Sequence, residues 1–221
     1  MPALSTAHEL VMNVYEINTL VKPPRGNFPN YASLTTEPAK FRRLGYDPFS
    51  GVPFPRRWEP LELYLEQPKY PQPDFFSFGS TVFVCSDRVR DLVGEALADD
   101  GEFLPVSIEG NSTPHFIYNI TSCPPVFDSE KSLWTYFGPK NAYKDLVMPA
   151  FRAERFGEES VFKFADVGAG TMYCLERTGD AEDGEFKALV ERERLTGIDF
   201  KLVWDSETGP VIPPPRVPMN R

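Results

Sequence analysis

The chain has 221 residues, a formal net charge of −9 and a hydrophobic fraction of 41%. A chain of this length buries about 70% of the surface that its unfolded form exposes, so it needs no disulfide or metal to fold. The acidic charge argues against a nucleic-acid-binding protein, which would carry a basic stripe. Residues 76–205 contain 13 Lys and Arg against 23 Asp and Glu, whereas residues 1–75 contain 8 of each. This imbalance indicates either simple solubility or a basic partner.

The cysteines and the start of the chain indicate the compartment. Cys85, Cys123 and Cys174 are odd in number and widely spaced, which does not predict a secreted disulfide framework. The first nine residues lack the basic segment and long apolar run of a signal peptide. No apolar run approaches the ~20 residues that cross a bilayer. We therefore expect a cytoplasmic protein with no membrane partner.

A short strand is predicted over residues 11–17, and a proline-rich segment follows it. Residues 21–73 contain eleven prolines, which disfavour long helices and central strands. The segment is also rich in aromatic residues, which a disordered linker would lack. We therefore predict that residues 1–73 form an ordered, loop-rich segment packed on the rest of the fold. The alternative, a proline-rich ligand for adaptor domains, leaves the aromatic side chains without a purpose.

A strand-helix-strand unit follows, beginning with the apolar run 81–85. Ser86 can cap a helix there, because its hydroxyl can accept a free backbone N–H. Five apolar residues at helical spacing then form one stripe: Val89, Leu92, Val93, Ala96 and Leu97. Alternation over 102–109 predicts a strand, and the turn residues 110–114 follow it. Residues 115–120 are predicted to return as the second strand of a hairpin.

The pattern between residues 121 and 157 is less regular. Residues 132–137 favour a short helix or turn, and 144–151 favour a strand that Pro149 interrupts. Residues 161–164 are predicted to form another strand.

A second strand-helix-strand unit repeats the layout of the first. The apolar run 172–175 precedes a predicted helix at 185–195 and an alternating strand at 198–205. Residues 206–221 contain five prolines in sixteen positions and are predicted to be an extended or mobile tail. The likeness of the two units is consistent with a duplication.

These patterns together predict an α+β fold with a mixed or antiparallel sheet and two main helices. The fold would be built from two similar strand-helix-strand units plus the proline-rich N-terminal segment. The predicted domains are residues 1–73, 74–205 and 206–221.

One glycine-rich segment resembles an enzyme motif. Residues 166–171 read Asp-Val-Gly-Ala-Gly-Thr and resemble the glycine-rich loop of class I methyltransferases. The expected next glycine is Met172, a strand is predicted where a helix should begin, and only about fifty residues remain for a doubly wound sheet. A tight turn between two strands is the interpretation that the pattern favours.

The other residue types give no assembled reaction centre. The cysteines form no Cys-x-x-Cys pair, and His8 and His115 are isolated, so no metal site is expected. A Cys–His nucleophilic pair could arise only through the fold. Cys85 and Cys174 end apolar runs and are predicted to be buried. We therefore expect no cofactor and no catalysis, with a small enzyme whose site is assembled across the fold as the alternative.

Three acidic clusters lie in or beside predicted loops and supply the candidate interface. Its residues are Asp99, Asp100, Glu102, Glu158, Glu159, Asp180, Glu182 and Asp183. Such clusters ordinarily form a solvated surface. Facing a cationic partner, they would accelerate association and fix its orientation.

Several short pieces between residues 74 and 205 together carry a family resemblance. They are Asp74-Phe75-Phe76, Val84-Cys85-Ser86-Asp87-Arg88-Val89-Arg90-Asp91-Leu92, Phe103-Leu104-Pro105-Val106, Tyr118-Asn119-Ile120, Phe127-Asp128-Ser129-Glu130-Lys131-Ser132, Val161-Phe162-Lys163 and Leu195-Thr196-Gly197-Ile198-Asp199-Phe200. In order and spacing they resemble the immunity proteins encoded next to bacterial polymorphic toxins, formerly a family of unknown function.

The resemblance implies a non-enzymatic protein that binds and neutralises a cognate toxin, encoded by an adjacent gene. It carries over no catalytic residues. We hypothesise that the toxin is a nuclease or another enzyme with a cationic site, which the acidic loops approach. A scaffold or interaction protein without a toxin partner is a further alternative, and self-association is left open.

Overall fold

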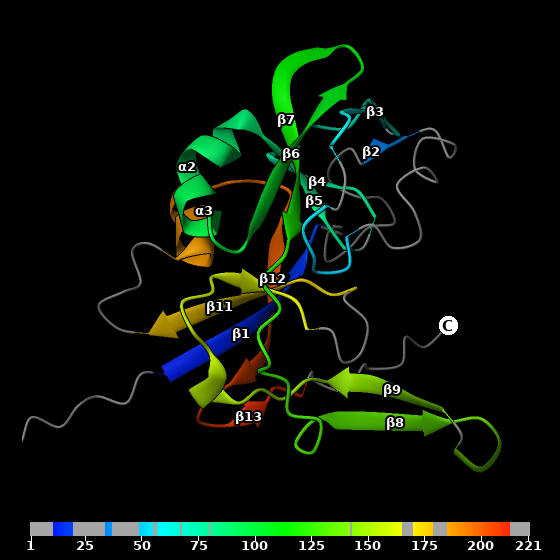
Figure 1. Ribbon diagram of the computed structural model, residues 1–221, viewed down its shortest axis with the longest axis vertical. Helices are drawn as coiled ribbons and strands as arrows, with labels where there is room; N and C mark the ends of the chain where they lie inside the picture. Colours follow the sequence, from blue (N-terminus) through cyan, green and yellow to red (C-terminus); the bar gives the residue numbers. More distant parts are fainter. Residues whose placement is uncertain are drawn as a thin grey trace, which may run out of the picture.

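The structure is a computed structural model that describes residues 11–19, 34–36, 49–54, 57–66, 68–79, 81–141, 143–164, 170–178 and 185–212. Within these residues the regular structure consists of two sheets, a separate hairpin, two α-helices and the short 3-10 helices η1 (Pro139–Asn141) and η2 (Ala153–Arg155) (Figure 1). The α+β class with mixed and antiparallel sheets and two main helices is therefore confirmed. Among the described residues, no helix has the length and apolar character needed to span a bilayer.

The first sheet has six strands in the order β2-β3-β6-β7-β5-β4. Their bounds are β2 Leu34–Thr35, β3 Leu61–Leu65, β4 Phe75–Ser77, β5 Phe83–Ser86, β6 Gly101–Ile108 and β7 Asn111–Ile120. All neighbours are antiparallel except β3 and β6, which makes this a mixed sheet. The hairpin predicted at 102–120 is confirmed as β6 and β7.

The second sheet has five strands in the order β10-β11-β1-β12-β13, all antiparallel. Their bounds are β1 Val11–Asn18, β10 Val161–Phe162, β11 Tyr173–Thr178, β12 Asp199–Asp205 and β13 Gly209–Pro210. The strand predicted near the start of the chain, β1, lies at the centre of this sheet. The predicted tail therefore begins as an edge strand, and its residues from 213 onward lie outside the described part.

Each predicted strand-helix-strand unit places its two strands on either side of a third. Helix α2, Asp87–Leu97, connects β5 to β6, and β7 runs antiparallel between them. Helix α3, Phe186–Arg192, connects β11 to β12, with β1 antiparallel between them. The middle strand follows the first unit along the chain but precedes the second. A duplication stays a prediction.

Helix α2 begins where its sequence predicts. The Ser86 hydroxyl accepts the backbone N–H of Val89 at 3.4 Å, and Asp87 lies in the positively polarised first turn. Val89, Val93 and Leu97 form the buried stripe. Leu92, which the spacing placed on that stripe, is 37% exposed because it lies at the margin of this i, i+4, i+8 face.

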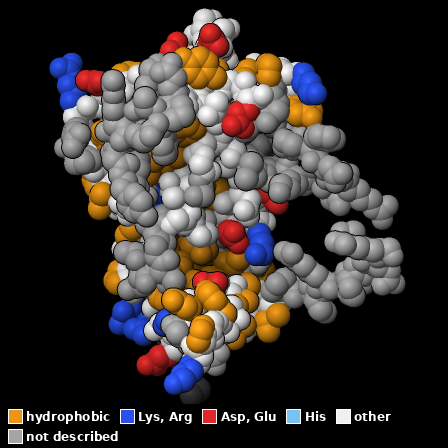
Figure 2. All heavy atoms as spheres, turned by 90° about the vertical axis from the view of Figure 1, so that its right-hand side faces the viewer, with side chains coloured by type: hydrophobic (Ala, Val, Ile, Leu, Met, Phe, Trp, Pro, Cys, Tyr) orange, Lys and Arg blue, Asp and Glu red, His pale blue; other side chains and the backbone are white. Residues whose placement is uncertain are grey.

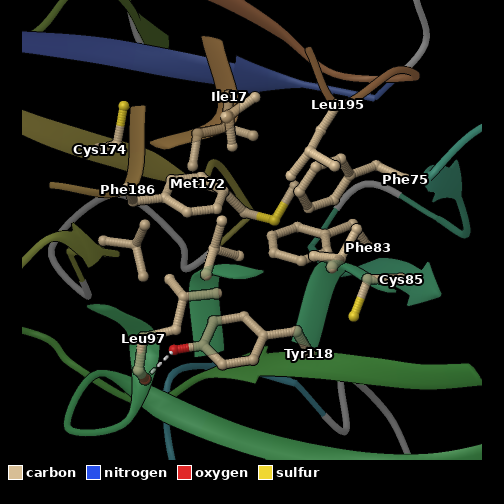
Figure 3. Close-up of a cluster of buried hydrophobic side chains, with 14 of the residues drawn as sticks. Ile17, Phe75, Phe83, Cys85, Leu97, Tyr118, Met172, Cys174, Phe186 and Leu195 are labelled. Atoms are coloured by element: carbon tan, nitrogen blue, oxygen red, sulfur yellow. Dashed lines mark hydrogen bonds between the residues drawn. The ribbon is translucent and has the colours of Figure 1, made fainter. Parts of the chain in front are cut away.

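An aromatic core joins the two units (Figure 3). Phe83 of β5 stacks on Phe186 of α3 with centroids 6.4 Å apart, and Phe75 of β4 contacts both rings edge-on. The Tyr118 hydroxyl donates to the Leu97 carbonyl at 2.7 Å, which satisfies a helix-end acceptor inside the core.

Two predicted buried thiols lie in the same core. Cys85 and Cys174 are each 0% exposed, and burial raises the pKa of both thiols. They therefore pack as small apolar side chains rather than as reactive groups.

Part of the predicted proline-rich segment forms β2 and β3 of the first sheet, and part packs against that sheet. Phe49 and Leu63 are buried there, and Trp58 donates its indole N–H to the Pro105 carbonyl at 2.7 Å. The fully buried Lys163 donates to the Phe49 carbonyl at 2.7 Å. Most of residues 1–48 lie outside the described residues, and the domain bounds stay a prediction.

The prediction of a short helix or turn at residues 132–137 is wrong. These residues form β8, Leu133–Phe137, which pairs antiparallel with β9, Tyr143–Met148. Residues 133–137 form a strand because they pair with residues of β9, and the spacing of apolar residues along the chain does not reveal this pairing. β9 and β10 confirm the strands expected near 144–151 and 161–164, with β9 ending before Pro149. The glycine-rich residues 165–169 lie outside the described residues.

Gly197 turns the chain between α3 and β12 at a point where only glycine fits. Its φ is +88°, and a Cβ there would overlap the Phe75 carbonyl and the Pro73 ring. Gly110, between β6 and β7, has a φ of +74° but open space around it. Both positions therefore require the left-handed backbone conformation that glycine adopts easily, but only Gly197 has neighbouring atoms where a side chain would lie.

We expect Gly197→Ala to lower the free energy of unfolding by roughly 3 kcal/mol or more, because strain adds to overlap. Gly110→Ala should lower the free energy of unfolding by about 1–2 kcal/mol, because it adds only the cost of a left-handed backbone conformation. Urea unfolding of both variants checks this. Equal losses would show that the contact at Phe75 is not tight.

Candidate functional site

The most prominent surface feature is the hairpin formed by β8 and β9, here called the arm (residues 133–148). It forms a two-stranded sheet of its own and projects from the side of the second sheet (Figure 1). Five of the eight exposed large hydrophobic side chains among the described residues lie on it: Leu133, Tyr136, Phe137, Tyr143 and Val147. Soluble monomers rarely gather exposed apolar side chains in this way unless the patch binds something.

Figure 2 looks at the side from which the arm projects. Hydrophobic side chains gather at its lower end, with both basic and acidic side chains at their margin. Tyr136 is 56% exposed and Tyr143 is 60% exposed. The arm therefore presents aromatic surface to solvent.

Contacts hold three aromatic side chains of the arm, Trp134, Phe137 and Tyr143, in place. Phe137 and Tyr143 are cross-strand partners whose rings stack with centroids 5.6 Å apart. The Lys144 ammonium lies 4.2 Å from the centroid of the Trp134 ring, a cation–π contact. Trp134 in turn contacts Phe127 edge-on and donates its N–H to the Ser129 carbonyl at 3.0 Å. These contacts hold Trp134, Phe137 and Tyr143 in defined positions.

A polar clamp fixes the base of the arm. The Ser132 hydroxyl donates to the Asp128 carbonyl at 2.6 Å and accepts the Ala150 N–H at 2.9 Å. The Asp128 carboxylate accepts the N–H groups of Glu130 and Lys131 at 3.1 and 3.2 Å. These bonds tie the start of β8 to the end of β9 and set the direction of the arm.

A groove of about 580 Å³ lies between the arm and the second sheet. Residues 144–149 form one wall, and Glu16, Lys201 and Val203 from β1 and β12 are on the other. Phe164, Thr171 and Tyr173 complete the lining, and a smaller cavity of about 220 Å³ also contains Glu16 and Thr171.

The groove combines apolar and charged groups. Glu16 and Lys201 form an ion pair at 3.2 Å across its far wall. Burial raises the pKa of the Tyr173 hydroxyl, which therefore stays a neutral hydrogen-bonding group. Asp145 is exposed, and no ion pair holds it within the described part of the chain. A cationic group approaching the arm would meet this carboxylate.

The first acidic cluster divides between surface and interior. Asp99 is exposed, but Asp100 is only 6% exposed and accepts the N–H groups of Ser160 and Val161 at 2.7 and 2.9 Å. Burial raises the pKa of the Asp100 carboxyl. Asp100 thus binds β10 to the end of α2 and offers no contact to a partner.

Glu102 also points its carboxylate inward. It accepts the Phe54 N–H at 2.6 Å and the Asn119 side-chain amide at 2.9 Å. Its role is to join the 49–54 segment to the β6–β7 hairpin.

The second acidic cluster lies beside the first. Glu158 is exposed, while Glu159 accepts the Gly157 N–H at 2.7 Å. The bond from Ser160 to Asp100 brings the two clusters together, and the charges of Glu159 and Asp99 both act on the Asp100 carboxyl. Asp180, Glu182 and Asp183 lie outside the described residues.

The titratable side chains of the described residues do not assemble a metal centre. None of their His, Cys, Asp and Glu side chains form a group of three suited to a metal ion. His115 is 3% exposed, packs edge-on against Phe76, and has its Nδ1 2.8 Å from the Thr113 carbonyl. Burial lowers the pKa of His115, so this ring is a neutral core residue.

The sequence contained a signal for the arm that its spacing alone did not reveal. An aromatic run at residues 134–137 and the single aromatic residue Tyr143 flank the turn residues 138–141. Aromatic residues on both sides of a Gly-Pro turn are typical of a hairpin.

No model of a known protein family matches this chain, and no curated protein matches it.

The clamp at the base of the arm should respond to pH. Burial alone would raise the pKa of Asp128, but the N–H groups of Lys131 and Glu130 and the Arg152 charge hold it below its usual range. The stabilisation is therefore present above the unfolded pKa of about 3.9 and is lost as pH falls through the lower folded pKa.

Asp128→Asn should lower the free energy of unfolding by about 1–2 kcal/mol near neutral pH and by little in acid. Urea unfolding across this pH range checks it. Ser132→Ala breaks the same clamp without a titrating group, so its cost should not follow pH. Parallel pH profiles for the two variants would contradict the assignment to Asp128.

Proposed function

We propose that this chain is an immunity protein that binds and neutralises a cognate bacterial toxin by protein–protein contact, with the arm as the main contact. The concentration of exposed, ordered aromatic side chains on one projecting hairpin carries the proposal. Such a surface costs free energy in water, and burial against a partner removes that cost. The family resemblance supports the choice of a toxin as the partner.

The arm has the properties of a binding hot spot. Tyrosine and phenylalanine bury a large area for few rotatable bonds, so little conformational entropy is lost on binding. The stacking of Phe137 on Tyr143 and the polar clamp at Ser132 reduce that loss further, because the bound geometry already exists. A few such residues supply most of the affinity in typical interfaces.

The net charge of −9 suits a basic toxin. Exposed acids such as Asp99 and Glu158 would attract a cationic surface and raise the association rate. Asp100 and Glu102 take no part, because their carboxylates bind backbone and amide groups inside the fold. Charge thus guides the encounter, and the arm holds the complex.

Neutralisation by this route requires no reaction by the chain itself. A protein bound over a toxin's active site blocks substrate by occupying its surface. The complex would form in the cytoplasm of the producing cell, where an adjacent gene supplies the toxin.

Tyr136→Ala should weaken binding to the toxin from the adjacent gene by roughly 30-fold, or about 2 kcal/mol, without changing thermal stability. Titration calorimetry and growth on co-expression with that toxin provide the readouts. Ile212→Ala is the matched control, since Ile212 is 72% exposed but lies outside the arm.

A wild-type chain that neither binds the toxin nor protects growth would refute the proposed function. Full protection by Tyr136→Ala with unchanged affinity would leave the function standing but remove the arm from the interface.

Replacing Glu158 and Asp99 by Lys should slow association with the toxin by roughly tenfold at low salt and much less at high salt. The dissociation rate should change little, because these residues guide the encounter. Stopped-flow kinetics at two ionic strengths measures both rates. An association rate that is insensitive to salt in the wild-type chain would rule out steering.

A further inference from the structure

The register of the arm divides its side chains between two faces. Directly opposed residues of an antiparallel pair lie on the same face, and alternate residues of a strand share that face. Tyr136 is opposite Lys144, and both share a face with Trp134, over whose ring the Lys144 ammonium lies. Phe137 is opposite Tyr143, and their stacked rings lie on the other face. The exposed aromatic side chains of the arm therefore point in opposite directions.

Beyond its base, the arm is open to solvent on both faces (Figure 1). At the base, Trp134 contacts Phe127, and Leu146 packs on the core. The three residues of β8 past Trp134 extend the arm by roughly 10 Å. There Tyr136 is 56% exposed on one face, and Phe137 is 47% exposed on the other. A flat surface covers only one face of a two-stranded ribbon, so a partner that covers both must have two walls.

The turn at the tip of the arm presents a cation. Lys140 is exposed there, and among the residues that the structure describes no ion pair holds it. Its backbone φ is +55°, in the left-handed region that glycine and asparagine adopt more easily than lysine. Such backbone strain concentrates at functional sites. A role for the Lys140 side chain in binding would explain a lysine at this position.

The charge of the arm is opposite to that of the rest of the chain. Residues 133–148 contain two lysines and one aspartate, a net charge of +1, so the other residues carry −10. Lys144 and Asp145 offset each other along β9, which leaves Lys140 as the charge of the tip. Complementary charges fix the orientation of a complex. The tip therefore suits a negatively charged surface.

We propose that the arm inserts into a cleft of the toxin that has apolar walls against its two aromatic faces and carboxylates at its floor facing Lys140. This rests on the proposed function and names the shape and charge of the surface that the arm meets. The acidic remainder of the chain meets a cationic surface outside the cleft. The two opposite charges of the chain thus direct the arm toward the cleft.

Hydroxyl-radical footprinting of the full chain with the toxin from the adjacent gene tests insertion. Tyr136 and Phe137 lie on opposite faces, and on binding both should be labelled roughly fivefold more slowly or less, because an interface core excludes water. Ile212, which is 72% exposed outside the arm, should keep its labelling rate. Protection of only one of the two aromatic side chains would mean flat docking and would overturn the proposal.

Substitutions at the tip test the acidic floor. Lys140→Glu should weaken toxin binding by roughly tenfold or more at physiological salt. Lys140→Gly also removes the charge but suits the left-handed backbone, so it should bind more weakly than the wild type without a lower melting temperature. Lys69→Glu, at an exposed lysine between β3 and β4, is the matched control and should change affinity by less than about twofold. Unchanged affinity of Lys140→Glu would overturn the proposal.

Two other occupants of the tip give distinct results. A dimer of the isolated chain in sedimentation experiments that Lys140→Glu abolishes would assign the tip to a second copy. Sedimentation of the isolated chain with phosphatidylserine-containing vesicles that Lys140→Glu prevents would assign it to a lipid surface. Either result would overturn insertion into a toxin cleft.

These outcomes are separate from those that test toxin neutralisation. A chain that binds the toxin with only one face of the arm protected keeps the proposed function and loses the insertion. A chain that does not bind the toxin at all refutes both.

Discussion

The structure depends on the packing of Phe83 against Phe186, with Phe75 edge-on to both rings. These residues come from β5, α3 and β4, so one aromatic cluster joins the first sheet to the second unit. Aromatic pairs add directional preference to the burial of apolar area. This cluster therefore fixes the relative position of the two sheets, and with it the wall against which the arm forms a groove.

Asp100 shows how a charged residue can serve this junction instead of a partner. Its carboxylate accepts two N–H groups at β10, and its carbonyl accepts those of Thr121 and Ser122. Without Asp100 these four N–H groups would lose their hydrogen-bond acceptors, and a covered N–H without an acceptor costs free energy. An acidic loop in the sequence is thus partly a structural joint, and only part of its charge reaches the surface.

The arm, in contrast, leaves apolar side chains exposed to water. Its base is fixed by Ser132 and Asp128 and its rings by mutual stacking, so the exposed surface has a defined shape. An ordered, exposed hairpin with an open edge is a hazard for aggregation unless it has a partner.

The sequence alone determined the elements whose signals are local. Ser86 and the Val89–Val93–Leu97 spacing predicted α2, and alternation predicted β6 and β12, because helix and strand periods are properties of neighbouring residues. Only the tertiary structure decided which strands meet. It placed β1 between β11 and β12, buried Asp100, turned the Glu102 carboxylate toward Phe54 and Asn119, made a strand of residues 133–137 and formed the groove beside β9. Each of these results depends on contacts between residues distant in the chain, which no local period records.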